Sequence, residues 1–174
     1  RVFLETYRQS LKRQTVPCEV VLADNSRDDA FGQTLTREGW RVIRVGPQRD
    51  QFENVFVSRQ AIVAEFLKEA YTHLFWVDAD VLVPADALEV LLSRNKEIVS
   101  GVYVSPFRYQ GITIVHPVAY QLTHDPNLRL PVQTPEMETN ALMEMHSVGF
   151  GCWLVKREVV ERVVDVVRIW LETF

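Results

Sequence analysis

The sequence predicts an α/β fold with a mostly parallel central sheet and antiparallel additions. Short apolar runs rich in β-branched residues alternate with runs whose apolar residues recur at helical spacing. The runs in the first half are continuously apolar, as in parallel strands that are buried on both faces. Beyond Ile98 the strand-like runs are separated by loops rich in Pro, Thr, Asn and Glu, which favours antiparallel additions there.

The first half of the chain predicts three strands with helices around them. Expected helices are residues 1–14, residues 54–70 and a short stretch after Pro84. Expected strands are residues 19–23, 41–45 and 73–77, and residues 24–29 form a polar loop. The order strand, helix, strand implies parallel strands that are joined by right-handed crossovers.

The second half of the chain predicts three more strands and a final helix. The strands are expected at residues 98–103, 118–122 and 148–155, and the helix begins at Lys156. Its broad apolar face consists of Val159, Val160, Val163, Val164, Val167, Trp170 and Leu171. Such a face needs a partner, and the chain opens in a helix with no strand before it. We therefore expect a fragment of a single domain, whose final helix packs on a missing portion or in a homodimer.

Composition and charge narrow the class of protein. The chain has 174 residues and 47% hydrophobic residues, which favours one globular domain with a substantial core. The net charge of −4 disfavours nucleic acid as a partner. Cys18 and Cys152 have no CxxC pairing, which disfavours a zinc site and fits a reducing compartment. No apolar run reaches the roughly 18 residues of a membrane span and no signal peptide opens the chain, so we expect a cytoplasmic protein, with attachment to a membrane face left open.

Two acidic clusters follow expected strands. One is the loop of residues 24–29, and the other is Asp78-Ala79-Asp80 directly after the strand of residues 73–77. Open α/β sheets bind ligands beyond the carboxyl ends of their strands. Two carboxylates separated by one residue suit Mg²⁺ or Mn²⁺, which keep open positions for phosphate oxygens. The alternative is an Asp pair that begins a turn and caps the helix after Pro84.

Three collinear segments carry a family resemblance. Residues 10–28 read SLKRQTVPCEVVLADNSRD, residues 54–84 contain Asn54, Ser58-Arg59 and the run LFWVDADVLVP, and residues 148–159 read VGFGCWLVKREV. In this order they resemble the opening segment, the Asp-x-Asp segment and the acceptor-side strand-to-helix segment of family 2 glycosyltransferases with the GT-A fold. Together the segments span most of the chain.

The resemblance implies a three-layer GT-A sandwich and sugar transfer from a nucleotide-sugar donor to a hydroxyl acceptor, with inversion. It implies that Asp24 contacts the nucleotide base beside Asn25 and that Arg59 lies near the diphosphate. It further implies that Asp78 lies near the ribose or the metal and that Asp80 binds Mn²⁺ or Mg²⁺ directly. Residues 1–97 would form the donor-nucleotide part and residues 98–174 the acceptor-side part, with a glycan, a lipid-linked molecule or a protein as acceptor.

The chain also departs from the family pattern. Gln60 stands where the family usually has Asn, and the family's first strand and its acidic general base are expected outside the chain. Within the chain, the nearest acidic residues that could serve as the base are Glu136, Glu138 and Glu144, of which Glu144 is the candidate. The histidines that compete for the role of an additional metal ligand are His116, His124 and His146, of which His146 is the candidate. Gly149 and Gly151 are expected to allow a bulge and a close backbone approach near the sugar.

Other functions compete with this interpretation. A phosphatase of the haloacid dehalogenase type also places Asp-x-Asp after an apolar strand, but here two strand–helix units precede it and Leu82 occupies the position of that family's Thr. A nucleotidyltransferase of similar topology and a non-catalytic nucleotide-sugar-binding or carbohydrate-binding domain remain alternatives.

Overall fold

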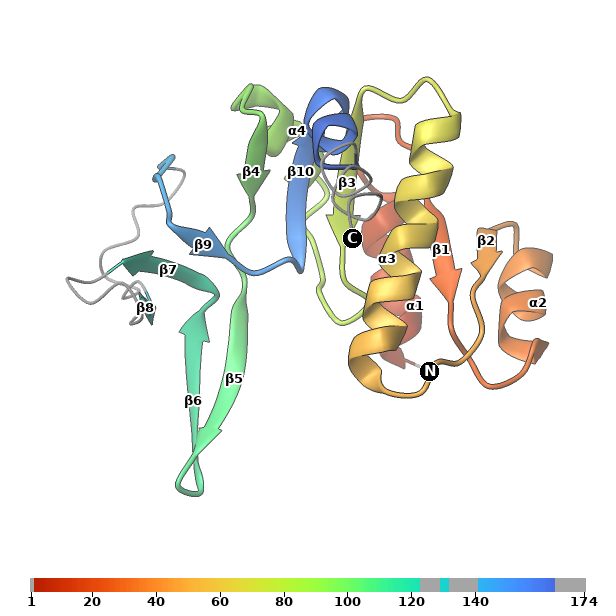
Figure 1. Cartoon of the computed structure of the whole chain (residues 1–174), viewed down its shortest axis with the longest axis horizontal. Helices are drawn as coiled ribbons and strands as arrows, with labels where there is room; N and C mark the ends of the chain where they lie inside the picture. The colour runs from red at the N-terminus through yellow and green to blue at the C-terminus, as the bar shows by residue number, and fades with distance from the viewer. Residues whose placement is uncertain (1, 123–128, 132–140, 165–174) are drawn as a thin grey trace, which may run out of the picture. The chain divides into compact units, whose positions relative to one another are not determined.

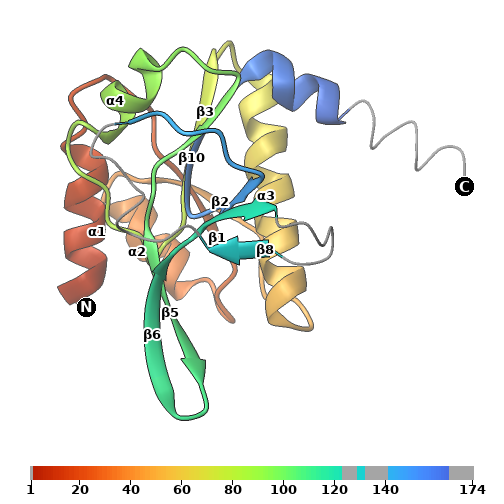
Figure 2. The ribbon, with the colours of Figure 1, turned by 90° about the vertical axis from the view of Figure 1, so that its left-hand side faces the viewer.

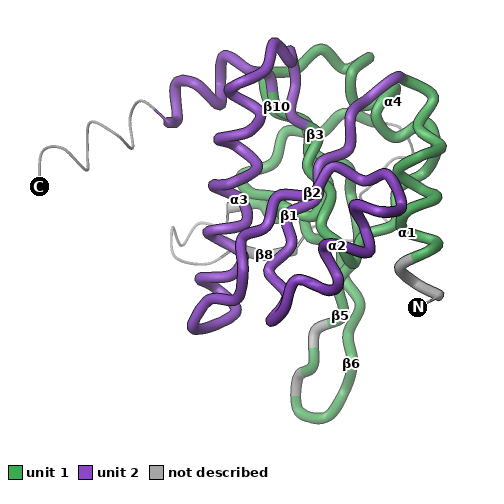
Figure 3. Tube along the Cα trace, turned by 90° about the vertical axis from the view of Figure 1, so that its right-hand side faces the viewer, with its two compact units in different colours: residues 1–16, 75–155 green, residues 17–74, 156–174 purple. Residues whose placement is uncertain are grey.

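The computed structural model describes residues 2–122, 129–131 and 141–164. The described chain mixes helices with strands, which confirms the α/β class. It forms two compact units (Figure 3): unit 1 contains residues 1–16 and 75–155, and unit 2 contains residues 17–74 and 156–174. No described helix is long and apolar enough to cross a membrane.

Unit 2 is built around a parallel strand pair. Its elements in chain order are β1 (Val21–Asp24), α2 (Ala30–Arg37), β2 (Arg41–Arg44) and α3 (Gln51–Lys68), followed by a helical stretch at residues 157–164. The strands β1 and β2 pair in parallel, with Val21 opposite Arg41, and α2 forms the connection between them. This pair confirms two of the three parallel strands expected in the first half, whereas the third, residues 73–77, lies in a different sheet.

The helix α2 was not expected from the sequence. It has only eight residues, and its sequence AFGQTLTR contains one Gly and two Thr, which are poor helix formers. Tertiary packing overrides this weak propensity, because Leu35 on its inner face is only 3% exposed. The chain leaves the helix through Gly39, whose φ of +84° suits glycine.

The helix α3 starts three residues before its expected position because of its N-terminal cap. The side chain of Asp50 accepts a hydrogen bond of 2.9 Å from the backbone N–H of Glu53. At the other end, the Arg157 guanidinium donates to the backbone carbonyls of Leu67 and Glu69, at 3.0 and 2.5 Å. These contacts satisfy carbonyls that the end of a helix leaves unpaired. The expected helix residues Val167, Trp170 and Leu171 lie outside the described residues.

Unit 1 contains two helices and most of a three-stranded sheet, of which residues 73, 74 and 156 belong to unit 2. Its first elements are α1 (Val2–Lys12), β3 (His73–Val77), α4 (Ala87–Ser93), β4 (Ile98–Ser100) and β10 (Cys152–Lys156). The strand order is β3-β10-β4, and β10 runs antiparallel to β4 with Leu154 opposite Val99. The observed β3 has the bounds that its apolar run predicts. Both Leu154 and Val99 are buried and belong to the core of this unit.

The remaining strands of unit 1 are β5 (Val104–Tyr109), β6 (Ile112–Pro117), β7 (Ala119–Leu122), β8 (Arg129–Pro131) and β9 (Ser147–Val148). The β5–β6 hairpin projects away from the three-stranded sheet (Figures 1 and 2) and replaces the loop expected there. Its tight turn uses Gln110 and Gly111, with φ of +48° and +81°. The expected strand of residues 148–155 is divided into β9 and β10 by the segment from Gly149 to Gly151.

The described strands form four small sheets whose pairings are mostly antiparallel. The antiparallel additions expected after Ile98 are therefore present. A single, mostly parallel central sheet is not seen among the described residues, where β1 and β2 form a separate parallel pair.

Candidate functional site

The acidic pair Asp78 and Asp80 lies on a turn at the carboxyl end of β3. The turn is closed by a hydrogen bond of 3.0 Å from the Val81 N–H to the Asp78 carbonyl. The Asp78 side chain is half-buried, whereas Asp80 is exposed to solvent. A short apolar strand thus ends in two carboxylates. Open α/β sheets bind their ligands beyond the carboxyl ends of their strands, which is the position of this pair.

Three hydrogen bonds hold the beginning of this turn. The Trp76 indole N–H donates to Asp78 Oδ1 at 2.8 Å, and the Asp78 backbone N–H donates to the Gly151 carbonyl at 3.0 Å. From α1, the Tyr7 hydroxyl donates to the carbonyl of Val77 at 3.2 Å. Side chains from α1 and β3 and backbone from the segment before β10 therefore meet at Val77 and Asp78.

Two phenols share the environment of the acidic pair. Burial, followed by the charges of Asp78 and Asp80, raises the pKa of Tyr7 to about 12. Burial also raises the pKa of Tyr103, and the same two carboxylates add to that effect, although a hydrogen bond from Gly151 opposes it. Both phenols therefore stay neutral near pH 7, and the negative charge of the site comes from the aspartates.

The close approach expected at Gly149 and Gly151 is to the ring of Tyr103. The Gly151 N–H donates to the Tyr103 hydroxyl at 3.0 Å. A Cβ added at Gly151 would lie 2.6 Å from Tyr103 Cζ, and one added at Gly149 would lie 2.5 Å from Val118 Cγ1. The two glycines are required by this packing, and the expected proximity to a sugar remains a prediction.

The structure does not bring His146 to the acidic pair as a further ligand. Within the described part of the chain, no three His, Cys, Asp or Glu side chains lie close enough together to hold a metal ion. The His146 side chain is exposed, and its backbone N–H donates to the Tyr120 carbonyl at 3.1 Å. The metal-binding roles of Asp78 and Asp80 remain predictions.

Two other candidates for acid–base or metal chemistry, Glu144 and His116, belong to no such group of described residues. Glu144 is exposed, and its role as a general base remains a prediction. The His116 ring lies 2.9 Å from the Pro117 carbonyl and packs edge-on against Tyr120. Three further candidates lie outside the described residues: His124, Glu136 and Glu138.

In unit 2, Asp24 is buried at the carboxyl end of β1. Only 4% of the residue is exposed, and its Oδ1 accepts hydrogen bonds from the backbone N–H and the hydroxyl of Ser26, at 3.0 and 2.5 Å. Its backbone carbonyl accepts from Val45 N–H at 2.9 Å and from Arg44 Nη1 at 2.9 Å. The residue therefore organises its own loop, and contact with a nucleotide base remains a prediction.

Asp24 retains one carboxylate oxygen without a hydrogen bond. Its Oδ2 is buried and has no hydrogen-bond partner among the described residues, and it lies 3.6 Å from Arg44 Nη1. A Cβ added at Gly32 of α2 would lie 2.5 Å from this oxygen, so only glycine lets α2 pack here. Arg44 also donates to Asp29 Oδ1 and to the carbonyl of Ser26, both at 2.7 Å.

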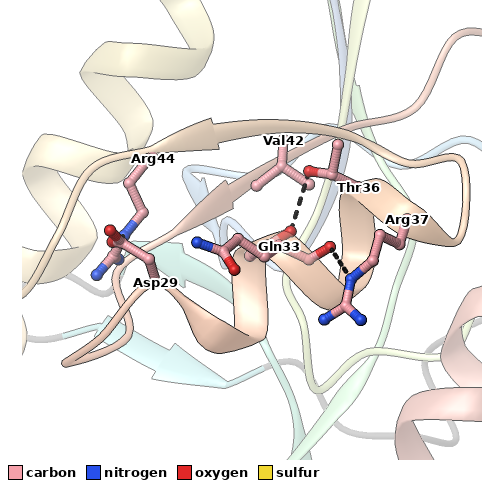
Figure 4. A pocket seen from close by; sticks show the side chains of 7 residues that line it. Asp29, Gln33, Thr36, Arg37, Val42 and Arg44 are labelled. Atoms are coloured by element: carbon pink, nitrogen blue, oxygen red, sulfur yellow. Dashed lines mark hydrogen bonds and ion pairs between the residues drawn. The ribbon is translucent and has the colours of Figure 1, made fainter.

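A shallow pocket of about 490 Å³ lies between α2 and β2 (Figure 4). Its lining consists of Asp29, Gly32, Gln33, Thr36, Arg37, Val42 and Arg44. Arg44 and Asp29 point toward one another at one end, and Arg37 lies at the other end, where its Nε is 3.3 Å from the Gln33 carbonyl. The sequence does not predict this pocket because it does not predict α2.

The other expected donor-site residues of unit 2 lie at or near α3. Asn25 is exposed, and its side-chain amide lies 3.5 Å from the Ser58 hydroxyl. Arg59 is the next residue along α3 and is half-buried. The loop after β1 therefore approaches α3 beside Arg59, whereas the expected contact of Arg59 with a diphosphate remains a prediction.

Comparisons with protein-family models, with curated proteins and with solved structures give no match. Function is therefore inferred from the acidic turn after β3, from the loop after β1 and from the sequence segments described above.

Sequence reasoning missed Tyr7, Trp76 and Tyr103 as neighbours of the acidic pair. One signal was available, because residues i and i+2 of an extended segment point to the same side. Trp76 and Asp78 have that spacing. Nothing in the sequence indicated that Tyr7 and Tyr103, which are far from β3 in the chain, come close to it.

Proposed function

We propose that the chain is a metal-dependent glycosyltransferase domain that transfers a sugar from a nucleotide-diphosphate donor to a hydroxyl acceptor, with inversion. The observation that carries the proposal is the pair of carboxylates on the turn that ends β3. The three sequence segments that resemble family 2 glycosyltransferases support it. A GT-A sandwich is part of the proposal, supported by the parallel β1–β2 pair and its α2 crossover.

The donor set fits a hard divalent cation. Asp78 and Asp80 supply carboxylate oxygens, which Mg²⁺ and Mn²⁺ prefer, and an octahedral ion bound by two residues keeps positions for phosphate oxygens and water. The phenols of Tyr7 and Tyr103 are neutral near pH 7, so they add no charge of their own to the site. A bound cation would neutralise negative charge on the departing diphosphate.

The residues of the chain have distinct roles in this proposal. Asp80 is exposed and supplies the direct ligand to the cation. Asp78 also binds the cation, and its carboxylate is held at the strand end by the indole N–H of Trp76. Asn25 is exposed and recognises the nucleotide base from the loop that the buried Asp24 organises, and Arg59 pairs with the diphosphate. Holding donor and acceptor in line would supply much of the rate enhancement. The acceptor is a glycan, a lipid-linked molecule or a protein.

Calorimetric titration of UDP and GDP, with and without Mn²⁺, tests the donor site. We expect one nucleotide to bind only when Mn²⁺ is present, and Asp80→Ala to weaken binding by at least about tenfold, because a ligand to the cation is lost. The matched control is Asp86→Ala, since Asp86 is also exposed, also belongs to unit 1 and makes no side-chain cap to α4. The control should bind as the wild type does.

Two outcomes would contradict the proposal. One is nucleotide binding that is indifferent to Mn²⁺ and to Asp80→Ala, and the other is a folded wild-type protein that binds neither nucleotide. Release of free nucleotide from a sugar-nucleotide separates an enzyme from a binding domain. A protein that binds with Mn²⁺ but releases no nucleotide in the presence of acceptors would be a non-catalytic sugar-nucleotide-binding domain.

A further inference from the structure

We propose that Trp76 is a positioning residue of the metal site, which fixes the carboxylate of Asp78 before a cation arrives. The inference rests on the proposed function, because it assigns a role within the same site. Its basis is the hydrogen bond of 2.8 Å from the indole N–H to Asp78 Oδ1. The contact comes from the strand itself, since Trp76 and Asp78 are two residues apart at the end of β3.

The chemistry of indole suits this role. Its N–H is a hydrogen-bond donor only, so it can orient a carboxylate but cannot compete with it for a cation. It is also uncharged, unlike Lys or Arg, so it leaves the negative charge of Asp78 available. Hydrogen bonds to ionised acceptors are about twice as strong as those between neutral groups. Trp76 therefore supplies orientation without neutralising the site.

The two aspartates differ in how firmly they are held. Asp78 is fixed at its side chain by Trp76 and at its backbone N–H by the carbonyl of Gly151. Asp80 is exposed and makes no hydrogen bond with a described residue. We infer an unequal pair, in which Asp78 is a preset ligand and Asp80 adjusts to the cation. Removing the indole donor would add rotamer freedom to Asp78 and so weaken cation binding.

A second tryptophan provides a matched control. Trp153 is half-buried in β10, which belongs to the same three-stranded sheet as β3. Its indole nitrogen is buried without a hydrogen-bond partner among the described residues, and its ring packs edge-on against Phe150. Trp76→Phe and Trp153→Phe thus remove the same atoms from one sheet, but only Trp76→Phe removes a donor to Asp78.

Electron paramagnetic resonance of free Mn²⁺ would measure cation binding directly, with Mn²⁺ alone and with Mn²⁺ plus UDP or GDP. We expect Trp76→Phe to weaken Mn²⁺ binding about tenfold, the usual effect of losing a partner that orients a metal ligand. Trp153→Phe should change it less than about twofold, and far-UV circular dichroism should show that both variants fold. Equal affinity of Trp76→Phe and wild type, or equal loss in both variants, would overturn the inference.

The same experiment separates this inference from the proposed function. If the wild type binds no Mn²⁺ under either condition, or if Asp80→Ala binds as tightly as the wild type, the proposed function fails and the inference fails with it. If the wild type binds Mn²⁺ and Asp80→Ala does not, but Trp76→Phe is unchanged, only the role of Trp76 is wrong.

A second measurement needs no change at Trp76, in case Trp76→Phe does not fold. Labelling the four tryptophans with ¹⁵N gives four indole N–H resonances, and Trp→Phe variants at the other three positions assign the signal of Trp76. We expect this N–H to exchange slowly with water and to shift when Mg²⁺ saturates the wild type, but not in Asp80→Ala. An indole signal of Trp76 that exchanges freely, or that ignores Mg²⁺ bound by the protein, would overturn the inference.

Discussion

Gly151→Ala should destabilise unit 1 through a single side chain, that of Tyr103. The new Cβ would lie 2.6 Å from Tyr103 Cζ and 2.8 Å from its hydroxyl oxygen, closer than any normal contact of a Cβ atom. Relieving the overlap costs about 1–3 kcal/mol, as in other overpacked sites. The shift would also strain two hydrogen bonds of 3.0 Å, from Gly151 N–H to Tyr103 and from Asp78 N–H to the Gly151 carbonyl. Since each contributes about 1 kcal/mol and the strain removes about half of each, we expect a total loss of about 2–4 kcal/mol.

Urea unfolding followed by far-UV circular dichroism would measure this loss as a change in the free energy of unfolding. A double-mutant cycle with Tyr103→Ala tests its cause, because all three nearest atoms to the new Cβ belong to Tyr103. In the Tyr103→Ala background, Gly151→Ala should cost about 1 kcal/mol or less. The comparison variant is Gly149→Ala, whose Cβ also meets Val118 Cγ1 at 2.5 Å and should remain costly in that background.

A loss below about 1 kcal/mol for Gly151→Ala in the wild-type background would show that the phenol does not crowd this position. An equal cost of Gly151→Ala with and without the ring of Tyr103 would show the same. That second result would mean that the glycine is required by its backbone and not by the approach of the phenol.

Two further predictions concern titration and thiol reactivity. The pKa of Tyr7 is about 12 in the folded protein and about 10 in an unfolded chain, so the folded state favours the neutral phenol. The contribution of Tyr7 to the free energy of unfolding is therefore intact below pH 10 and is lost as the pH rises from 10 to 12. The loss is roughly 2–3 kcal/mol. Tyrosinate absorbance should show a component that titrates near pH 12 and that Tyr7→Phe removes, and a wild type without that component would contradict the prediction. Cys152 is 6% exposed and burial raises the pKa of its thiol, so Ellman's reagent should modify exposed Cys18 first and Cys152 only after unfolding. Cys18→Ser should abolish the rapid phase, and a rapid phase that survives it would show that Cys152 is accessible.

The strands of the first half and the longer helices were predictable because their signals are local. An unbroken apolar run specifies β3 by itself, and helical spacing specifies α1 and α3 within a few residues. The helix α2 and the β5–β6 hairpin were missed. Their residues have weak or mixed propensities, and packing of Leu35 and the turn at Gln110 and Gly111 decide their conformation.

The same division holds at the candidate site. The position of Asp78 and Asp80 follows from the sequence, because the residues that come directly after an apolar strand must lie at its end. The state of Asp24 does not follow, since a polar loop sequence gives no sign that its carboxylate is buried against Ser26 and Gly32. Burial of a carboxylate depends on which helix packs over it, and that helix was not predicted.

By itself, the sequence determined the α/β class, the placement of two carboxylates after β3 and the resemblance that suggests sugar transfer. Only the tertiary structure decided which groups surround those carboxylates: Tyr7 from α1, Tyr103 after β4 and the backbone of Gly151 before β10. The physical reason is the separation along the chain of the residues that each property involves. Periodicity and strand ends are properties of adjacent residues, whereas hydrogen bonds to Asp78 and Val77 join segments separated by about 70 residues, whose meeting depends on the packing of the whole unit.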